Sequence, residues 1–281
     1  MSKILITGSK GTLGRYLTTS LADSLHTLIP TDRRTLNITK KDKVREYISQ
    51  TKPDVVIHLA ALTNVDECER HTKKALRVNT ESTRNIADAC KEANALLIFL
   101  STSAIFSGDK KGYKETDPPA PANFYGKTKL MAEEYITRIL KKHIIIRAGW
   151  MIGGGKKEKK FISYVINDIK AGKNISVVND KFGSITYAKE LADFIKSLID
   201  TKGKHGIYHF TSQGYCSRYD LAKEIVKILK KSTKVIPVSS DSFKKVYFAP
   251  RPKYEVLLTN RDEKNPTWKK SLKNYIQNEF I

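Results

Sequence analysis

Short apolar runs alternate with stretches of helical spacing along the first half of the chain. Runs of strand length lie at residues 4–7, 27–30, 55–59, 96–101 and 143–147. Helical spacing recurs between them, at residues 12–25, 42–50, 73–93 and 126–140. In the first of these stretches Leu13, Leu17, Leu21 and Leu25 are four residues apart, as on one helix face. This alternation predicts an α/β fold, a Rossmann-like doubly wound parallel sheet with right-handed crossovers.

The pattern loosens after residue 147. Three glycines at 153–155 precede a lysine-rich run at 156–160, which is typical of an exposed loop. Short strands are expected at 175–178 and 207–210, and a helix at 219–230. We therefore predict that residues 1–150 form the Rossmann domain. Residues 151–281 are expected to form a smaller C-terminal substrate-binding lobe, interwoven with the last strands of the main sheet.

Length and composition favour a cytoplasmic protein. The 281 residues suffice for one large or two unequal domains. No apolar run approaches the roughly 20 residues that a membrane helix needs, and the first strand begins almost at Met1. Three cysteines form no close pairs, so neither a disulfide framework nor a zinc site is expected.

The chain is strongly basic, with 51 Lys and Arg against 29 Asp and Glu and a net charge of +22. Such a charge suits nucleic acid when the cations are clustered. Here the lysine runs are scattered over predicted helices and loops, which favours solvated surface, and we predict no nucleic-acid partner. A basic field would still attract anionic cofactors and nucleotide-linked substrates.

A glycine-rich turn follows the first expected strand, and a helical stretch follows the turn. The glycines are Gly8, Gly11 and Gly14, with Lys10, Thr12 and Leu13 between them. Residues without Cβ allow a tight turn and close approach of a pyrophosphate, and a helix N-terminus offers free N–H groups to it. An ordinary tight turn is the alternative, but the strand and the helix on either side favour a dinucleotide site.

Tyr125 and Lys129 are four residues apart, so a helix would place them on one face. Tyr219 and Lys223 repeat this spacing, but only Tyr125 follows an apolar strand that ends in hydroxyl residues. A phenol beside an ammonium suits a general acid for carbonyl reduction. We expect Lys129 and the positive nicotinamide ring to lower the pKa of Tyr125 from its usual value of about 10.

The choice of cofactor depends on the end of the second strand. Asp32 would accept hydrogen bonds from an unphosphorylated ribose, as in NADH, whereas Arg33 and Arg34 would meet the 2′-phosphate of NADPH. Two adjacent arginines favour NADPH, with NADH as the alternative. After the third strand, Ala60, Ala61 and Thr63 would line the nicotinamide side, and Asn79 would support the central strands.

Several further stretches occur in a characteristic order. They include Leu36–Thr39, His58–Glu69, Val78–Asn79, Ser101–Gly108, Tyr113–Asp117, Ile146–Trp150, Asn179–Ala188 and Arg251–Pro252. Together with the glycine turn and the Tyr125 segment, they resemble an extended short-chain dehydrogenase/reductase, and specifically the dTDP-4-dehydrorhamnose reductase family. The resemblance runs nearly from end to end.

The resemblance implies roles for individual residues. Thr102 would be the catalytic hydroxyl that orients the substrate carbonyl, although in sister epimerases the serine falls one position later, at Ser103. Lys129 would also hold the cofactor ribose, and Asn37 and Ile38 would lie near the cofactor. Trp150 would pack near the sugar, and Arg251 would reach the nucleotide diphosphate, where a guanidinium makes bidentate contacts.

The chain also departs from the family pattern. Ser103 and Ala104 stand where the family usually has an acidic and an aromatic residue, Ile185 replaces a proline, and Arg15 replaces a glutamate that takes part in a metal-linked dimer in some members. We therefore predict no structural metal.

The implied function is NAD(P)H-dependent reduction of a nucleotide-linked 4-keto-6-deoxy sugar, dTDP-4-dehydrorhamnose above all, in polysaccharide biosynthesis. Two alternatives stay open: an epimerase or dehydratase of sugar nucleotides, and a non-catalytic subunit, since the regulatory subunit of methionine adenosyltransferase resembles the same family. A monomer or a homodimer is expected.

Overall fold

A six-stranded parallel sheet forms the centre of the molecule in a computed structural model, which describes residues 1–22, 24–155, 160–259 and 265–281. Its strands stand in the order β10-β5-β4-β3-β1-β2. Their bounds are β1 Lys3–Thr7, β2 Thr27–Thr31, β3 Val55–His58, β4 Leu96–Thr102, β5 His143–Ala148 and β10 Gly206–Phe210. Each adjacent pair is parallel, so the predicted doubly wound α/β architecture is confirmed.

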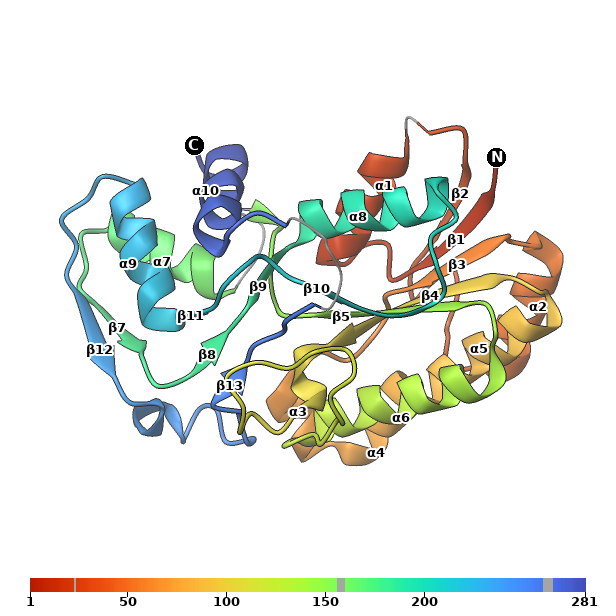
Figure 1. Ribbon diagram of the computed structural model, residues 1–281, viewed down its shortest axis with the longest axis horizontal. Helices are drawn as coiled ribbons and strands as arrows, with labels where there is room; N and C mark the ends of the chain where they lie inside the picture. The colour runs from red at the N-terminus through yellow and green to blue at the C-terminus, as the bar shows by residue number, and fades with distance from the viewer. Residues whose placement is uncertain (23, 156–159, 260–264) are drawn as a thin grey trace.

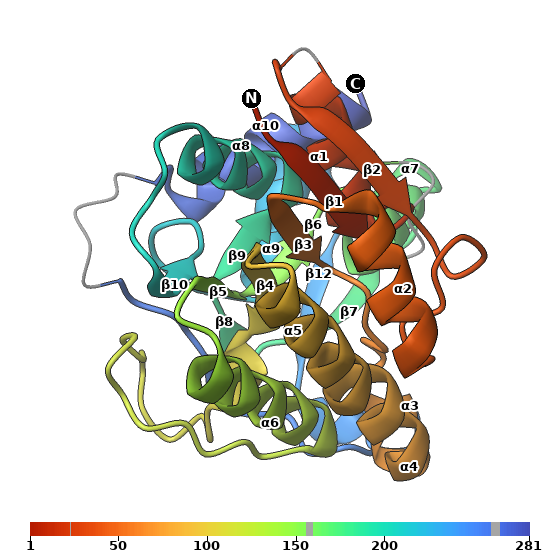
Figure 2. The ribbon, with the colours of Figure 1, turned by 90° about the vertical axis from the view of Figure 1, so that its right-hand side faces the viewer.

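Helices cover both faces of this sheet (Figure 2). On one face lie α1 (Thr12–Ala22) and α8 (Ala188–Asp200), and on the other lie α2 (Lys41–Thr51), α5 (Ser82–Glu92) and α6 (Phe124–Ile139). Leu13, Leu17 and Leu21 of α1 are buried against the sheet, as their spacing predicted. Leu25 is 82% exposed, so the predicted helix at 12–25 is too long, because the apolar face leaves the core after Leu21.

The predicted helix at 73–93 is not one continuous α-helix. The structure has α3 (Val65–Arg70), α4 (Thr72–Ala75) and a π-helical segment η1 (Leu76–Glu81) before α5. The Asn79 side chain on η1 bonds to the loop after β3 and to α6. A π-helical segment inserts a wider turn into the helix, often at a functional position. The spacing of apolar residues in the sequence does not reveal such a turn.

The second half adds a lobe beside the sheet (Figure 1). It contains α7 (Phe161–Lys170), α9 (Arg218–Ile228) and α10 (Trp268–Glu279), with the paired strands β7 (Ile175–Val178) and β12 (Val235–Val238). Its own apolar core includes Ile166, Leu221, Tyr275 and Ile276. The strand β10, which completes the main sheet, also comes from beyond residue 150. Of the lysine-rich run at 156–160, which was predicted to form an exposed loop, residues 156–159 lie outside the described residues.

Very short elements join the lobe to the carboxyl edge of the sheet. They are the 3-10 helix η2 (Ser103–Ile105), β6 (Trp150–Ile152), β8 (Phe182–Gly183), β9 (Ile185–Tyr187), β11 (Cys216–Ser217) and β13 (Tyr254–Glu255), whereas the 3-10 helix η4 (Ser240–Phe243) follows β12 within the lobe. The sheet formed by β11, β8 and β13 lies beside β9 (Figure 1), which precedes α8 and pairs with β6, the strand after β5. Because ligands of such folds bind at the carboxyl ends of the strands, these elements face the expected site.

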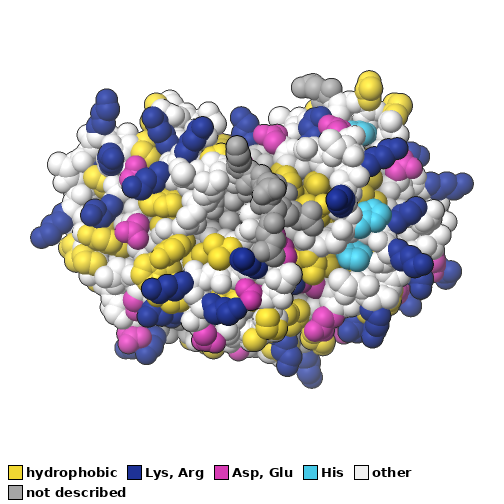
Figure 3. All heavy atoms as spheres, viewed as in Figure 1, with side chains coloured by type: hydrophobic (Ala, Val, Ile, Leu, Met, Phe, Trp, Pro, Cys, Tyr) yellow, Lys and Arg dark blue, Asp and Glu magenta, His cyan; other side chains and the backbone are white. Residues whose placement is uncertain are grey.

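The basic side chains are scattered over the face seen in Figure 3, with acidic and apolar groups between them. A few of the basic residues of the chain form exposed ion pairs with acids, such as Lys43 with Glu46 and Arg45 with Glu92. No helix of the described residues is long and apolar enough to cross a membrane.

Candidate active site

The glycine turn lies between β1 and α1, where the strand order reverses. Gly8 has a left-handed φ of +71°, and a Cβ on it would come within 2.9 Å of the Ala60 backbone nitrogen after β3. A Cβ on Gly14 would come within 2.5 Å of the Ser9 carbonyl oxygen, so this glycine allows α1 to pack on the turn. Gly11 is exposed, and its Cβ would meet only the Gly8 carbonyl oxygen, at 3.2 Å. The turn therefore leaves the N-terminus of α1 open to a phosphate, and the site fits a dinucleotide.

Leu13 and Thr12, which were also predicted to bind the cofactor at this turn, have different surroundings. The Leu13 side chain is buried in the core, so only its backbone N–H is placed to meet a phosphate. Lys160, which follows the 153–155 glycines, comes within 3.5 Å of the Thr12 hydroxyl through its ammonium group. The lobe thus contributes a cation beside the first turn of α1.

Several charged residues lie at the end of β2, beside the glycine turn. Lys10 forms an ion pair with Asp32, whose second oxygen accepts hydrogen bonds from the backbone N–H groups of Arg34 (2.8 Å) and Thr35 (3.1 Å). Lys10 and then these N–H groups hold the pKa of Asp32 well below its ordinary range. The acid predicted for a ribose hydroxyl is therefore already engaged. Arg33 and Arg34 are exposed beside a hollow that Lys10, Arg15 and Asp32 help to line.

Asn37 and Ile38 hold the segment after β2. The Asn37 side chain accepts hydrogen bonds from the Thr39 N–H (3.2 Å) and hydroxyl (2.9 Å). Ile38 is buried in the core of the α2 and α5 face, and its carbonyl accepts a bond from Asn85. Their side chains support this segment, so any contact with the cofactor would come from the backbone.

The loop after β3 is held by Asn79 from η1. The Asn79 amide accepts from the Leu62 N–H at 2.7 Å and donates to the Leu62 carbonyl at 3.0 Å. It also donates to the Thr128 hydroxyl on α6 at 3.1 Å. Asn79 is therefore a support rather than a lining residue, whereas Ala60 and Ala61 are partly exposed and Thr63 is exposed. One amide thus fixes this loop relative to the helix that carries Tyr125.

Thr102, at the carboxyl end of β4, carries a hydroxyl group that lowers the pKa of Tyr125 and also accepts a hydrogen bond from the Ala104 N–H at 3.2 Å. Asn123 caps α6 by accepting from the Gly126 N–H at 2.9 Å, and a Cβ on Gly126 would come within 2.0 Å of the Ala104 carbonyl oxygen. The first turn of α6 therefore packs directly on η2. Ser103 is buried, and its hydroxyl donates to Glu255 at 3.2 Å, so Thr102 is the hydroxyl that faces Tyr125.

Lys129 is 3% exposed, and its ammonium lies 3.9 Å from the centroid of the Phe99 ring. Burial lowers the pKa of Lys129 to about 7. The negative charge of Glu133, one turn further along α6, raises this pKa but does not offset the effect of burial. Burial, and then Lys129, lower the pKa of His58 on β3 to about 3, so this imidazole is neutral at pH 7.

The expected lowering of the Tyr125 pKa is wrong for the ligand-free site. Burial raises the pKa of Tyr125 to about 12, and the effect of Thr102 offsets only part of that rise. Lys129 is itself desolvated and does not contribute to the shift. A raised pKa keeps the phenol protonated at neutral pH, which is the form that a general acid requires.

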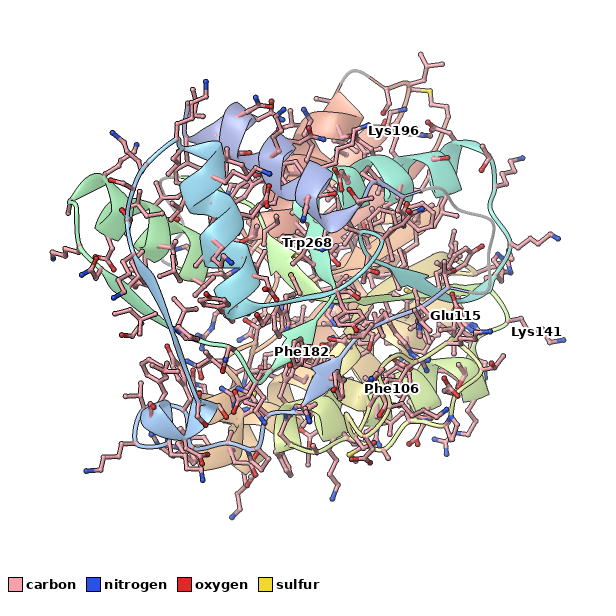
Figure 4. All side chains as sticks on the ribbon, turned by 60° about the vertical axis from the view of Figure 1, so that its left-hand side comes forward. Phe106, Glu115, Lys141, Phe182, Lys196 and Trp268 are labelled. Atoms are coloured by element: carbon pink, nitrogen blue, oxygen red, sulfur yellow. The ribbon has the colours of Figure 1, made fainter. Side chains whose placement is uncertain are left out.

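A buried ion pair anchors the far part of α6. Glu133 bonds to Arg147 on β5 at 2.8 Å, and Arg147 also contacts His209 on β10 at 3.3 Å. Glu115 accepts from the His209 N–H at 3.2 Å, near the Phe106 ring labelled in Figure 4. This network ties the catalytic helix to two strands and to the 110–117 loop.

Two charged residues of the site were missed at the sequence level. Glu255 on β13 accepts hydrogen bonds from Ser103 and, at 3.3 Å, from the Trp150 indole N–H. Arg218, the first residue of α9, lies over the Trp150 ring at 4.0 Å. The only signal for Glu255 was a single carboxylate inside the apolar run 254–257, and for Arg218 a cation directly after a helix N-cap.

Arg251, which was predicted to reach the nucleotide diphosphate, bonds to other parts of the chain. Its guanidinium forms an ion pair with Asp66 of α3 at 2.6 Å and donates to the Ala249 carbonyl at 3.0 Å. A role in binding the diphosphate would require this ion pair to open or to be shared, because both contacts use the terminal nitrogens of the guanidinium.

The parallel sheet, the glycine turn at its switch point and the Tyr125, Lys129 and Thr102 group together define an NAD(P)-dependent oxidoreductase of the extended short-chain dehydrogenase/reductase class. The family model of the RmlD substrate binding domain matches residues 2–280, and the chain belongs to this family.

Similar proteins agree with this assignment. A crystal structure of dTDP-4-dehydrorhamnose reductase from Yersinia enterocolitica is 42% identical, with a TM-score of 0.94 over 100% of both chains. The reductase from Bacillus anthracis, solved in complex with NADP, is 33% identical with a TM-score of 0.93 over 99% of both chains. The spore coat polysaccharide biosynthesis protein SpsK of Bacillus subtilis is 32% identical over 99% of this chain and 98% of its own length.

The exposed arginines after β2 provide a test of cofactor choice. Replacing both Arg33 and Arg34 with Ala is expected to weaken NADPH binding by roughly 2 kcal/mol, because charge-assisted hydrogen bonds to the 2′-phosphate are lost. NADH binding should change little. Titration calorimetry with both cofactors measures this, with Arg45→Ala on α2 as the control. An equal loss of binding free energy for NADPH and NADH would show that the two arginines do not contact the 2′-phosphate and act only through long-range electrostatic attraction.

Burial of Lys129 predicts a stability that depends on pH. The folded pKa of about 7 lies below the ordinary value of 10.5, so between these values only the unfolded chain binds the proton. Stability of the ligand-free protein therefore rises as pH increases through this window. Lys129→Met should be more stable than wild type by roughly 1 kcal/mol or more below about pH 7, with a gap that narrows toward pH 10.

Denaturant unfolding of the ligand-free protein over this pH range measures the gap. Lys127→Met, at an exposed position of the same helix, should show none. A constant gap at all pH values would contradict the burial of a charge at position 129.

Proposed function

We propose that this chain is an NADPH-dependent reductase of the 4-keto group of a nucleotide-linked 6-deoxyhexose, converting dTDP-4-dehydrorhamnose to dTDP-L-rhamnose. The observation that carries the proposal is the grouping of Tyr125 with Thr102 and the buried Lys129, at the same sheet edge as the glycine turn. Relatives named dTDP-4-dehydrorhamnose reductase, such as that of Aggregatibacter actinomycetemcomitans at 35% identity over 79% of this chain, support the substrate class.

The chemistry follows from the positions of these groups. The nicotinamide supplies a hydride when the cofactor is bound. The Thr102 hydroxyl orients the substrate carbonyl, and the Tyr125 phenol gives its proton to the carbonyl oxygen as negative charge develops there. With the cofactor bound, Lys129 would hold the ribose, as the family resemblance implies, and its charge would then favour transfer of the proton from Tyr125. The Gly8 to Gly14 turn and the N-terminus of α1 would hold the pyrophosphate.

Two features of the cofactor site support NADPH over NADH. Asp32 is paired with Lys10, so it is a poor acceptor for a free ribose hydroxyl, and Arg33 and Arg34 are exposed beside it. NADH remains the alternative that the calorimetric titration above distinguishes. We also retain a cytoplasmic location, a monomeric or homodimeric state and the absence of a structural metal as predictions.

A panel of substrates tests the proposal. Purified protein is incubated with NADPH and with dTDP- or UDP-linked 4-keto-6-deoxyhexoses, and absorbance of the reduced nicotinamide is followed. Rapid loss of absorbance with the dTDP-4-keto sugar is expected. Interconversion of sugar nucleotides without net cofactor oxidation would instead identify an epimerase, and cofactor binding without any turnover would identify a binding subunit.

A further inference from the structure

We propose that Glu255 is a sugar-binding residue of this enzyme, which accepts a hydrogen bond from a ring hydroxyl of the hexose and thereby helps to select the sugar. The proposal rests on the proposed function and adds to it the group that recognises the sugar. The carboxylate reaches the site from β13, about 130 positions along the chain from Tyr125 (Figure 1).

The position of Glu255 is fixed by its surroundings. β13 pairs with β8, where Tyr254 is opposite Phe182 and Glu255 is opposite Gly183. The Phe182 ring, labelled in Figure 4, stacks on Tyr254 with centroids 5.4 Å apart. A Cβ on Gly183 would lie 2.5 Å from the Trp150 ring, so Trp150 packs directly on the backbone of β8. The carboxylate therefore stands on a rigid support.

The two carboxylate oxygens of Glu255 bond to two different residues near Tyr125 and Thr102. One accepts from the hydroxyl of Ser103, the residue after Thr102, at 3.2 Å, and the other from the Trp150 indole N–H at 3.3 Å. The negative charge of Glu255 also contributes to the raised pKa of Tyr125. A substrate whose carbonyl meets Tyr125 and Thr102 would thus place its sugar ring beside this carboxylate.

The carboxylate retains capacity for a ligand. An ionised carboxylate has about four acceptor positions, and the neighbouring side chains fill two of them. Among the residues that the structure describes, no lysine or arginine lies within ion-pair distance of Glu255. The Arg218 guanidinium lies on the Trp150 and Phe161 rings; burial lowers the pKa of Arg218, and the charge of Glu255 acts against that shift. Hydroxyl groups of a sugar are the donors that such a half-satisfied acceptor takes.

The negative charge of Glu255 also favours contact with the sugar over contact with the diphosphate of the substrate. A carboxylate repels the diphosphate of a sugar nucleotide, so it would disfavour that end and accept the neutral hexose. Ser103 stands where an acidic residue was expected from the family pattern, and here its hydroxyl donates to Glu255. The acidic group of this site therefore comes from β13 instead of from the end of β4.

Substrate analogues combined with variants test the proposal. Glu255→Ala and the isosteric Glu255→Gln are compared with wild type on the keto sugar and on analogues that lack the 2- or the 3-hydroxyl. We expect kcat/KM for the full substrate to fall roughly 10- to 100-fold in Glu255→Ala, the usual effect of losing a hydrogen bond to a charged group. For one deoxy analogue the variant and wild type should be equal, because the partner hydroxyl is already absent. Asp241→Asn, an exposed acid on the same lobe, should behave as wild type.

The KM for NADPH and the stabilisation by cofactor should not change in either Glu255 variant. A loss of equal size on every analogue, or no loss, would overturn the proposal. Should wild type turn over no keto sugar, the proposed function fails by itself, and calorimetric binding of dTDP-L-rhamnose is measured instead. Weaker binding in both Glu255 variants would then still support a sugar contact, and unchanged binding would refute it.

Discussion

Tyr125→Phe is expected to lower kcat by roughly 10² to 10⁴-fold, the usual contribution of a positioned general acid. Burial raises the pKa of this phenol to about 12 and so keeps it protonated at neutral pH. Removing one oxygen atom leaves the ring packing intact, so cofactor binding should persist. Steady-state kinetics with the keto sugar and a thermal shift with NADPH measure the two effects.

Tyr219→Phe is the matched control for this prediction. Tyr219 has the same spacing to Lys223, whose ammonium lies 5.4 Å from the Tyr219 ring centroid, but it packs on the core of the C-terminal lobe. Turnover by this variant should equal that of wild type. Near-normal turnover by Tyr125→Phe would remove Tyr125 from the mechanism.

Gly11→Val is expected to abolish cofactor binding while the fold persists. Position 11 is exposed, and a Cβ there contacts only the Gly8 carbonyl, whereas the Val side chain would fill the space at the N-terminus of α1. At a cofactor concentration of 100 times Kd, wild type should gain about 2.7 kcal/mol of stability and the variant none.

Thermal unfolding with and without NADPH provides the measurement for Gly11→Val. Thr19→Val, on an exposed position of the same helix, should keep the full stabilisation. A Gly11→Val protein that is still stabilised by NADPH would place the cofactor elsewhere.

The elements that sequence predicted well have strong local signals. The strands of the main sheet are continuous apolar runs, because both faces of a parallel sheet are covered by helices, and their ends differ from the predicted ones by one residue. The glycine turn and the Tyr125 helix were predictable for the same reason, since each depends on residues close together in the chain.

The remaining parts depend on contacts between distant segments. No helix was predicted at 188–200, although Leu191 and Ile195 have helical spacing and pack against α1. The strands β8, β9, β11 and β13 have only two or three residues each, too few for any periodicity to appear.

The protonation behaviour and the pairing of the charged residues of the site could not be predicted from the sequence either. The pKa of Tyr125 depends on how deeply tertiary packing buries it. The role of Glu255 depends on β13 pairing with β8, far away in the chain. The pairing of Asp32 with Lys10 and of Arg251 with Asp66 likewise follows from which acids the folded chain brings within reach.

The central claim is that this site moves a hydride to the carbonyl carbon of the sugar while Tyr125 protonates its oxygen. The most direct measurement uses NADPH that carries deuterium at the transferable position of the nicotinamide, together with the dTDP-4-keto-6-deoxyhexose. Our account predicts one deuterium at C4 of the product sugar in NMR spectra, formed by wild type and almost absent with Tyr125→Phe. Product without deuterium at C4, or bound NADPH that is never oxidised, would contradict it.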